Sequence, residues 1–415
     1  MSETENNIIT FGCRLNACES EIIQEFSRSI GLDDYTLINT CAVTAEAERK
    51  LRQTIRKLYK KNPDIKIILT GCASELHPDK YFEMDGVVGI VSNKFKLSKA
   101  EYLNFSKTPN EKLEISGEKN KKVRGFLQIQ NGCDQKCTYC IVRVTRGPNV
   151  SFDKDKIVAQ AEKLLQKGYK EIFLTGVNIS SYGRDLKTGE NLATLIKYIL
   201  DKVPNLKRLG LSSLDPADID DELIDVIATE ERLLPHIHES IQSGDDLILK
   251  RMLRRHSREQ VVEINHKILE RRPDVVFGAD IIVGFPTETD EMFGNTKKLL
   301  KEAKISLLHS FPFSKRPGTP AARMPQVPRK IALARVQDLK IFSQKLLREK
   351  LSEFIGKECV ILAEDGRSGK TNSFIPIISL KKLKTGNEYR FLCESISEKG
   401  LVGKPLEDLS KNLEG

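Results

Sequence analysis

The sequence lacks several features that would assign it to common classes of protein. Its longest apolar runs fall far short of the 18 or more residues that span a bilayer, and its first residues, MSETENN, are polar and show no secretory-signal pattern. We therefore expect no membrane segment and a cytoplasmic location. The six histidines show neither an HExxH motif nor another paired-ligand spacing, so each is expected to be an ordinary surface or core residue.

The cysteine content also argues against a secreted, disulfide-bonded protein. The chain has nine cysteines, an odd number, and several follow predicted strands. In a chain of 415 residues without a signal pattern, this favours metal chemistry over disulfides. With 39% hydrophobic and 30% charged residues, most of the chain should be globular, and its length allows two or three domains with sizeable cores.

The densest cysteine group lies in the segment Gly132 to Cys140, where Cys133, Cys137 and Cys140 form a CxxxCxxC array. Three such thiolates can cap three irons of a four-iron cluster and leave the fourth iron open to a substrate or cofactor. Zinc and plain buried thiols are the alternatives. Structural zinc needs four ligands and usually a second CxxC or HxxxH, and none follows nearby. We therefore predict an iron-sulfur site.

Three further cysteines follow predicted parallel strands in the first part of the chain. Residues 8–11, 36–40 and 65–70 are apolar or β-branched, and each run precedes a helical pattern. Such alternation predicts a parallel sheet, whose carboxyl edge is the usual place for ligands. Cys13, Cys41 and Cys72 should meet there as a second metal site, with buried packing as the alternative. The remaining cysteines are expected to pack in the interior: Cys18, Cys359 and Cys393.

A second βα pattern begins after a polar linker predicted at residues 107–122. Its six predicted strands are too few for a closed eight-stranded barrel but suit an open barrel that admits a large substrate: 126–130, 171–174, 208–211, 236–241, 275–282 and 307–311. Ligand contacts are expected from residues at the strand ends and from the tyrosine before the last cysteine of the array, although tight turns require glycine anyway: Tyr139, Gly176, Asn178, Ser213, Gln242, Arg254 and Gly284.

The last part of the chain predicts a long helix at 329–351 and short strands at 359–363, 374–378 and 389–393, typical of a small β-barrel. The segment Gly366 to Thr371 is no phosphate loop, because only two residues separate its glycines where that motif needs four. The predicted division is an α/β domain at 1–106, a linker at 107–122, the open barrel at 123–345, the small β-barrel at 346–405 and a tail at 406–415.

The net charge of +9 is concentrated in two segments, Ala47 to Lys61 and Lys250 to Arg258. Clustered lysines and arginines can neutralise phosphates and release counterions, which favours a nucleic-acid partner. A solvated helix surface is the alternative.

The ordered motifs resemble those of a known family. The array with Tyr139 before its last cysteine resembles the radical S-adenosylmethionine superfamily. TFGCRLNACESE, INTCAVT, LTGCAS, IQNGCDQKCTYCIVRVTRG, LTGVNISSYG, LSSLDP, SIQSGDD, DIIVGFPTET and FSKRPGTPA are similar to the methylthiotransferases, most of all the branch that acts on N6-threonylcarbamoyladenosine of transfer RNA. The resemblance implies an α/β fold with a flavodoxin-like first domain, an open (β/α)6 radical-SAM partial barrel and a TRAM-like β-barrel that grips RNA.

Site roles follow from the same resemblance. Cys133, Cys137 and Cys140 would hold the [4Fe-4S] cluster that binds S-adenosyl-L-methionine, and Cys13, Cys41 and Cys72 an auxiliary [4Fe-4S] cluster. Departures from the family pattern are Cys18 and Glu239, where Tyr and Leu are usual, Ala73, near which an aromatic is usual, and Phe313, which replaces a common Tyr. Glu239 is expected beside the barrel mouth.

The implied reaction begins with one-electron cleavage of S-adenosylmethionine to a 5'-deoxyadenosyl radical, which activates C2–H of adenosine 37 in the tRNA anticodon loop. The auxiliary cluster would supply the sulfur, and a reductase or flavodoxin-type protein the electrons; the chain is expected to be a monomer. Alternative substrates are isopentenyl-adenosine of tRNA and an aspartate of a ribosomal protein. Outside this family, the chain would be an iron-sulfur electron carrier or an RNA-binding protein with structural metal.

Overall fold

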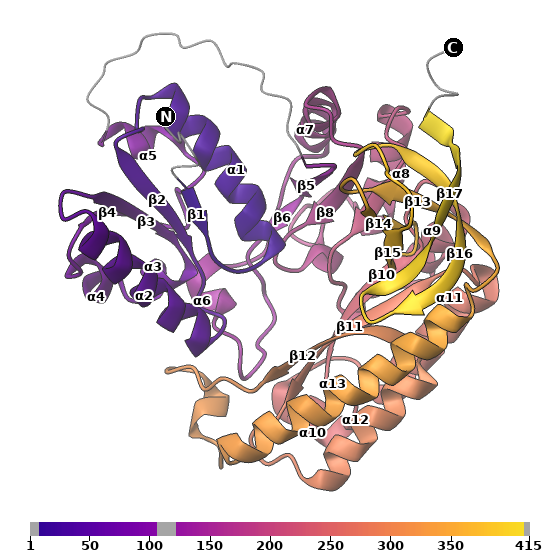
Figure 1. The fold of residues 1–415 in the computed structure, drawn as a ribbon. Coiled ribbons are helices and arrows are strands. Elements are labelled where there is room, and N and C mark those ends of the chain that lie inside the picture. The colour runs from indigo at the N-terminus through magenta and orange to yellow at the C-terminus, as the bar shows by residue number, and fades with distance from the viewer. Residues whose placement is uncertain (1–7, 106–121, 411–415) are drawn as a thin grey trace.

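The computed structural model describes residues 8–105 and 122–410 of the chain. The predicted linker therefore lies outside the described residues except for its last residue. Figure 1 shows three bodies, an α/β domain at the N-terminal end, a larger α/β core and a small β-barrel, with the core between the other two. No helix in the described ranges is long and apolar enough to cross a membrane.

The first domain is a parallel four-stranded sheet with helices on both faces. The strands are paired in chain order: β1 (Ile8–Thr10), β2 (Tyr35–Thr40), β3 (Lys66–Gly71) and β4 (Val87–Val91). Successive strand residues point to opposite faces, so Leu37 packs with Ile23 while Ile38 packs with Leu51. The helices divide accordingly between one face, α1 (Arg14–Ser29) and α5 (Lys99–Leu103), and the other, α2 (Ala45–Lys61) and α4 (Pro78–Phe82).

The core is the expected six-stranded open barrel. One parallel sheet contains β5 (Arg124–Gln128), β8 (Glu171–Thr175) and β9 (Leu209–Leu211), and a second contains β10 (His236–Gln242), β11 (Val276–Val283) and β12 (Ile305–Pro312). Two bridges next to β9 join the sheets, Leu209 to Leu233 and Leu214 to Glu239. The described strands β5 and β12 are not paired with each other, so the barrel is open between them.

The helices of the core begin where the sequence supplies a capping side chain. A carboxylate, amide or hydroxyl oxygen accepts a backbone N–H at each start, which satisfies a donor that the helix leaves free. The capped helices are α7 (Lys154–Gln166), α8 (Leu192–Lys202), α9 (Asp221–Thr229), α10 (Asp246–Met252), α11 (Arg258–Arg271) and α12 (Asp290–Glu302).

Alternation along the barrel strands divides their side chains between the helix layer and the barrel interior. Leu127, Ile172, Leu174, Leu209 and Phe277 lie in the large apolar core. Their neighbours therefore point inward. The inward set is unusually polar for a barrel interior and includes Arg124, Phe126, Gln128, Glu171, Phe173, Ser212, His236, His238, Ser240, Asp280 and His309.

The C-terminal part follows α13 (Arg329–Ser352) and forms a closed five-stranded barrel. Its strands are β13 (Glu358–Ala363), β14 (Ser368–Thr371), β15 (Pro376–Ser379), β16 (Glu388–Ser397) and β17 (Gly400–Asp408). The sequence predicted three of these strands and missed β14 and β17. The predicted limits at 346 and 406 fall inside α13 and β17.

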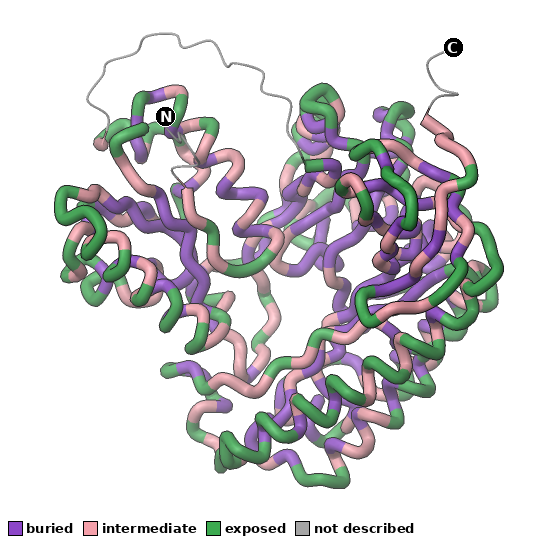
Figure 2. Tube along the Cα trace, in the orientation of Figure 1, coloured by how far each residue is buried: buried purple, intermediate pink, exposed green. Residues whose placement is uncertain are grey.

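The small barrel covers the end of the open barrel where the core strands begin. Phe374 stacks on His236 at a centroid distance of 4.9 Å and lies 5.3 Å from Phe173. Arg208, 4% exposed, donates to Glu171 and Glu388 at 2.9 and 3.0 Å and so joins the two bodies. Figure 2 shows buried backbone concentrated in the strands and where the small barrel meets the core. The opposite end of the open barrel, where the core strands finish, is not covered by the small barrel and can receive ligands.

Candidate functional site

The CxxxCxxC loop lies at the carboxyl end of β5, between β6 (Gln130–Asn131) and α6 (Val142–Arg146). The fully buried Gln130 side chain holds it in place. Its amide nitrogen donates to the carbonyls of Asn131 and Gly132 at 2.9 and 2.6 Å, while its oxygen accepts the N–H groups of Val177 and Asn178 at 3.0 Å each. The loop is thus tied to the tip of β8. Gln130 was not among the predicted site residues, although its position just before the cysteine array indicates that its side chain can reach the loop.

A second anchor connects the loop to the far side of the core. The Thr138 hydroxyl donates to the Arg251 carbonyl at 2.8 Å, and its N–H donates to the Met252 carbonyl at 3.1 Å. The Thr138 carbonyl accepts from Ala321 N–H at 2.9 Å. Since these partners come from α10 and from the segment after β12, the loop is fixed at both sides of the barrel mouth.

The three thiols of the array have polar N–H groups around them. Backbone N–H groups of Gln135 and Val142 lie 3.4 Å from the sulfurs of Cys133 and Cys140. Arg254 Nη1 lies 3.7 Å from the Cys137 sulfur, and its other nitrogen pairs with Asp215 at 3.0 Å. Burial raises the pKa of the Cys140 thiol to about 12. Donors of this kind and a bound metal both favour the thiolate, which is the ligand form.

The second triad stands at three strand tips of the first domain, as predicted. Cys41 and Cys72 follow β2 and β3 directly, and Cys13 follows β1 after Phe11 and Gly12. Gly12 has φ +107°, and a Cβ there would lie 2.8 Å from the Cys41 Cβ, so only glycine lets these two tips approach. Burial raises the pKa of the Cys41 thiol to about 11, and the nearby Cys72 and Cys13 thiols add to that rise.

The two triads lie on adjoining surfaces of the first domain and the core. Ile141, which follows Cys140, packs in the same apolar cluster as Cys72 and Ala73. Arg146 of α6 donates to Asn16 and Glu19 of α1 at 2.6 and 2.7 Å. Lys96 also binds the Glu19 carboxylate, and all three charged side chains are at most 3% exposed. A buried ion network therefore fixes the distance between the halves of the site.

The spacing of the thiols bears on the kind of metal they suit. A tetrahedral zinc with Zn–S bonds of about 2.3 Å brings its sulfurs to roughly 3.8 Å from one another. Within residues 8–105 and 122–410, the only group of three or more possible ligands with all its atoms within 4.8 Å is His238, Asp280 and His309, so neither cysteine triad meets that limit. Wider spacing suits a multi-iron cluster, because each thiolate then caps a different iron.

The other predicted ligand contacts are distributed around the barrel mouth. Gly176 approaches Gln130 so closely that a Cβ would lie 2.7 Å from its amide oxygen. Asn178 is buried beside it, and the Ser213 and Ser240 hydroxyls are 2.7 Å apart. Gln242 ends β10 with φ 73°.

Two further predicted contact residues, Tyr139 and Gly284, also pack against neighbouring groups. The Tyr139 ring lies edge-on to Phe285 at 6.4 Å. Gly284 lies against α13, where a Cβ would come within 2.4 Å of the Ala332 Cβ.

Cys18 is buried as expected, and its thiol donates to the Phe126 carbonyl at 3.3 Å. Cys359 and Cys393 lie together in the small barrel with their sulfurs 3.6 Å apart.

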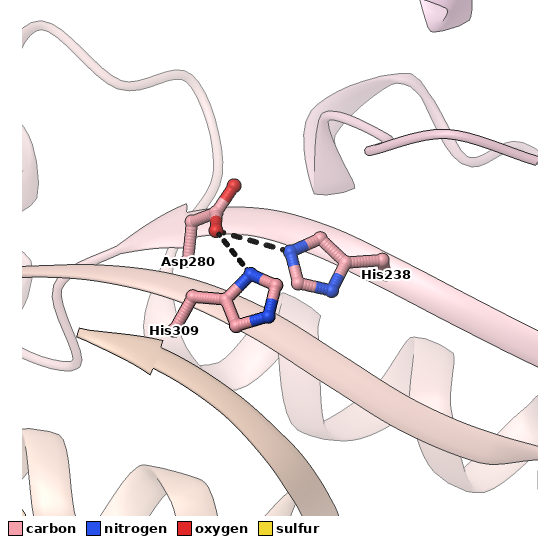
Figure 3. Close-up of side chains that lie close together, drawn as sticks. All are labelled: His238, Asp280 and His309. Carbon is pink, nitrogen blue, oxygen red and sulfur yellow. Dashed lines mark ion pairs between the residues drawn. The ribbon is translucent and has the colours of Figure 1, made fainter. Parts of the chain in front are cut away.

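The histidines are not all isolated residues, which corrects one expectation. Figure 3 shows His238, Asp280 and His309 brought together from β10, β11 and β12. The Asp280 Oδ1 atom lies 3.1 Å from His238 Nε2 and 3.5 Å from His309 Nδ1. Burial alone would raise the pKa of Asp280, but these two imidazoles lower it. The sequence HIHES carried a signal, since its alternation places His236 and His238 on one strand face.

Glu239 does not lie beside the barrel mouth, as the sequence had suggested. It points into the layer between β10 and α11, fully buried, where Asn265 donates to it at 3.1 Å. Burial raises the pKa of Glu239 to about 8. The strand alternation that turns His238 inward turns Glu239 outward.

The basic segments are also used differently from the expectation. In the second segment, Arg251 donates to Thr287 at 2.7 Å, Arg254 pairs with Asp215, and Arg255 and Arg258 pair with Asp218 and Glu302. These charges mostly serve the fold. On α2, by contrast, six cations are exposed, and among the described residues only Arg49 of these has an ion pair, with Glu46; the other five are Lys50, Arg56, Lys57, Lys60 and Lys61.

Comparison with known proteins gives matches along nearly the whole chain. A family model described as the radical SAM superfamily matches residues 127–300, and one described as uncharacterized protein family UPF0004 matches residues 5–92. A threonylcarbamoyladenosine tRNA methylthiotransferase MtaB from Rickettsia prowazekii is 46% identical over 94% of this chain and 95% of the relative. The protein of that name from Bacillus subtilis is 35% identical over 86% and 84%.

Two other matches differ in name. A tRNA-2-methylthio-N(6)-dimethylallyladenosine synthase from Ehrlichia canis is 34% identical over 89% of each chain. Among solved structures, the radical S-adenosylmethionine methyltransferase TsrM from Kitasatospora setae, with cobalamin and a [4Fe-4S] cluster bound, has a TM-score of 0.53. It is 14% identical, with 74% of this chain and 70% of that chain covered, so the likeness is one of fold.

Proposed function

We propose, from the fact that the chain belongs to the radical S-adenosylmethionine methylthiotransferase family, that it converts N6-threonylcarbamoyladenosine at position 37 of tRNA to its 2-methylthio derivative. The observation that carries the proposal is the pairing of two cysteine triads across one interdomain contact, in a chain with 46% identity to a relative of that name. An electron carrier or a structural-metal protein has no need for an open, polar barrel beside its metal.

The proposed ligands are the two triads, each for a [4Fe-4S] cluster: Cys133, Cys137 and Cys140, and Cys13, Cys41 and Cys72. When bound, the clusters and S-adenosyl-L-methionine would supply a carbon-centred radical and the sulfur. The chain's own part is to position and shield them. Gln130 and Thr138 hold the first loop, Arg254 donates toward Cys137, and the Glu19 network sets the distance to the second triad.

Cofactor contacts at the mouth are proposed for polar groups that lie at the strand ends. Asn178 follows β8, and its N–H donates to the Gln130 side chain that holds the first loop. Ser213 follows β9 and bonds Ser240, and Gln242 ends β10. The Gly176 backbone can approach a ligand closely. Tyr139 and Gly284 remain in the proposed set as backbone contacts, because the Tyr139 ring packs against Phe285 and Gly284 has no side chain.

The proposed RNA contact includes the rim formed by α2. Its first N–H, that of Ala45, donates to the Ser314 hydroxyl at 3.1 Å just beyond β12, so the helix begins at the barrel mouth. Its five exposed cations without an ion pair in the described ranges can bind phosphates while a loop nucleotide enters the barrel. We further propose a cytoplasmic monomer that accepts electrons from a reductase or flavodoxin-type protein.

Iron analysis after anaerobic reconstitution tests the cofactor content. Two clusters correspond to about eight irons per chain, and replacing either cysteine triad with alanine should leave about four. Cys359→Ala is the matched control, because it removes a thiol that lies in the small barrel. A count near four for the intact chain would contradict the two-cluster proposal.

The substrate is tested in cells and in vitro. Mass spectrometry of tRNA nucleosides from a deletion strain should show loss of 2-methylthio-threonylcarbamoyladenosine, and the purified protein should restore the modification on tRNA with a reductant and S-adenosylmethionine. Loss of the methylthio form of isopentenyl-adenosine instead would assign the reaction to that alternative. An unchanged tRNA profile would direct attention to the ribosomal-protein aspartate.

A further inference from the structure

One cation from the first domain reaches into the barrel of the core. Arg14 follows Cys13, but its guanidinium lies over rings of the barrel interior and the small barrel, 5.1 Å from the Phe173 centroid and 5.7 Å from that of Phe374. The charged groups that act on this guanidinium are Arg124, Asp280 and Glu171, all at inward-facing strand positions. The side chain thus enters the interior from the open side beside β5.

Arg14 has no anionic partner of its own. Within the described ranges no carboxylate forms an ion pair or hydrogen bond with it; its guanidinium has the two cation–π contacts and only a longer-range attraction to Asp280 and Glu171. A partly buried guanidinium without a hydrogen-bonded counter-ion favours binding of an anion from outside the chain.

The nearby carboxylates are already bound by other groups. Glu171 accepts from Arg124 and Arg208, and Glu364 accepts from Arg124 at 2.8 Å. Asp280 lies between His238 and His309. A further cation, Lys370, lies 3.4 Å over the Phe374 ring and has no ion pair in the described part of the chain. Arg14 and Lys370 are therefore cations of this interior that no carboxylate in the described part of the chain pairs with.

Two unpartnered polar side chains lie higher in the same interior. Gln128 is 7% exposed, and both its amide atoms are buried with no hydrogen-bond partner. The Ser212 hydroxyl, on the tip after β9, is likewise buried and unpartnered. Buried amides and hydroxyls are almost always hydrogen-bonded, so both point to a polar ligand inside the barrel.

We propose that Arg14 binds the carboxylate of the threonylcarbamoyl group, and that this contact selects N6-threonylcarbamoyladenosine over adenosines whose N6 substituent is uncharged. The inference rests on the proposed function. A carboxylate can accept two N–H bonds from the planar guanidinium, the pairing for which arginine is best suited. An apolar isopentenyl group at the same place would leave the guanidinium desolvated and unpaired.

The test measures binding of two anticodon stem-loops, one with threonylcarbamoyladenosine at position 37 and one with its methyl ester, which lacks only the charge. Fluorescence anisotropy with the reconstituted protein should give a Kd about 10- to 100-fold lower for the acid, the value of a charge-assisted hydrogen bond. In Arg14→Gln the two Kd values should become equal, because binding of the acid weakens while binding of the ester is unchanged. Arg14→Lys should retain part of the preference.

Two controls separate charge recognition from damage to the fold. Arg28→Gln removes the same charge from the other, exposed end of α1 and should leave the Kd ratio unchanged. Iron content per chain should be equal in wild type and Arg14→Gln. A preference that survives Arg14→Gln overturns the inference, and so does equal weakening of both RNAs.

The wild-type protein distinguishes failure of this inference from failure of the proposed function. If it methylthiolates the threonylcarbamoyl stem-loop but Arg14→Gln keeps the preference, only the role of Arg14 is refuted. If it binds acid and ester equally and modifies an isopentenyl stem-loop instead, the proposed substrate itself is wrong.

Discussion

Replacing Glu19 by glutamine should loosen the contact that holds the two cysteine triads in register. The Glu19 carboxylate is fully buried and accepts hydrogen bonds from Lys96 and from both terminal nitrogens of Arg146. Burial alone would raise the pKa of Glu19, but the two cations outweigh it and the pKa is lowered. Removing the carboxylate leaves two buried cations without their anion, which costs about 3–5 kcal/mol.

Hydrogen exchange detected by mass spectrometry can measure this loss locally. A change of about 3–5 kcal/mol in opening free energy corresponds to roughly 100- to 4,000-fold faster exchange in α1 and α6 peptides. Glu25→Gln is the matched control on α1, because its pair with Lys167 is about half exposed and contributes at most about 1 kcal/mol. Glu19→Gln together with Lys96→Met should recover part of the protection. Equal exchange in the Glu19 and Glu25 variants would refute the reasoning.

The pH dependence of the same exchange gives an independent check. A carboxyl whose pKa is lowered on folding stabilises the protein above its ordinary pKa of 4.5, and this contribution is lost as the pH falls through the folded pKa. Wild-type α1 should therefore lose protection in acid, while the Glu19→Gln variant, already weakened, should change less over that range.

Two further predictions concern single positions. A Cβ at Gly132, where φ is +71°, would lie 1.7 Å from the Pro148 carbonyl oxygen, so Gly132→Ala should abolish iron binding by the CxxxCxxC loop. Gly147→Ala meets no atom within 4 Å, so it should cost only the strain of its φ of +76° and ψ of −165°, about 1–3 kcal/mol, and keep the iron. Equal iron in both variants would show that the loop does not need this approach. Since burial raises the pKa of Glu239 to about 8, wild type should lose about 2 kcal/mol of stability relative to Glu239→Gln between about pH 6 and 8. Urea unfolding measures this loss, and parallel curves for the two proteins would mean that Glu239 does not titrate in that range.

Local patterns were enough to predict most strands and the place of the first cysteine triad at the strand ends; its role as a metal site stays a prediction. Cys41 and Cys72 follow their strands directly and Cys13 follows β1 after Phe11 and Gly12, and parallel strands of one sheet must end at a common edge. The register between the domains was not predictable, because it depends on Glu19 meeting Arg146, a pair 127 residues apart. Nothing in the local sequence of either residue indicates that pairing.

The missed features share the same cause. β14 and β17 contain glycine, lysine and acidic residues, so their alternation is weak, and only barrel closure makes them strands. His238 and His309 become neighbours only when β10 and β12 flank β11. The arginines after α10 look like a phosphate-binding segment until their distant acids, such as Asp215 and Glu302, are in place.

The packing of Phe374 against His236 and Phe173 covers the barrel where its strands begin, so the mouth and the open side between β5 and β12 are the ways into its interior. In the proposed function, an RNA loop bound at the mouth would close the first of these and limit the access of water to a reactive carbon centre. Product must then leave by the path the substrate took, so a fresh nucleotide cannot enter until the modified one has withdrawn. Removing the small barrel should therefore harm the chemistry more than it harms RNA binding, because it unseals the floor while leaving the rim intact.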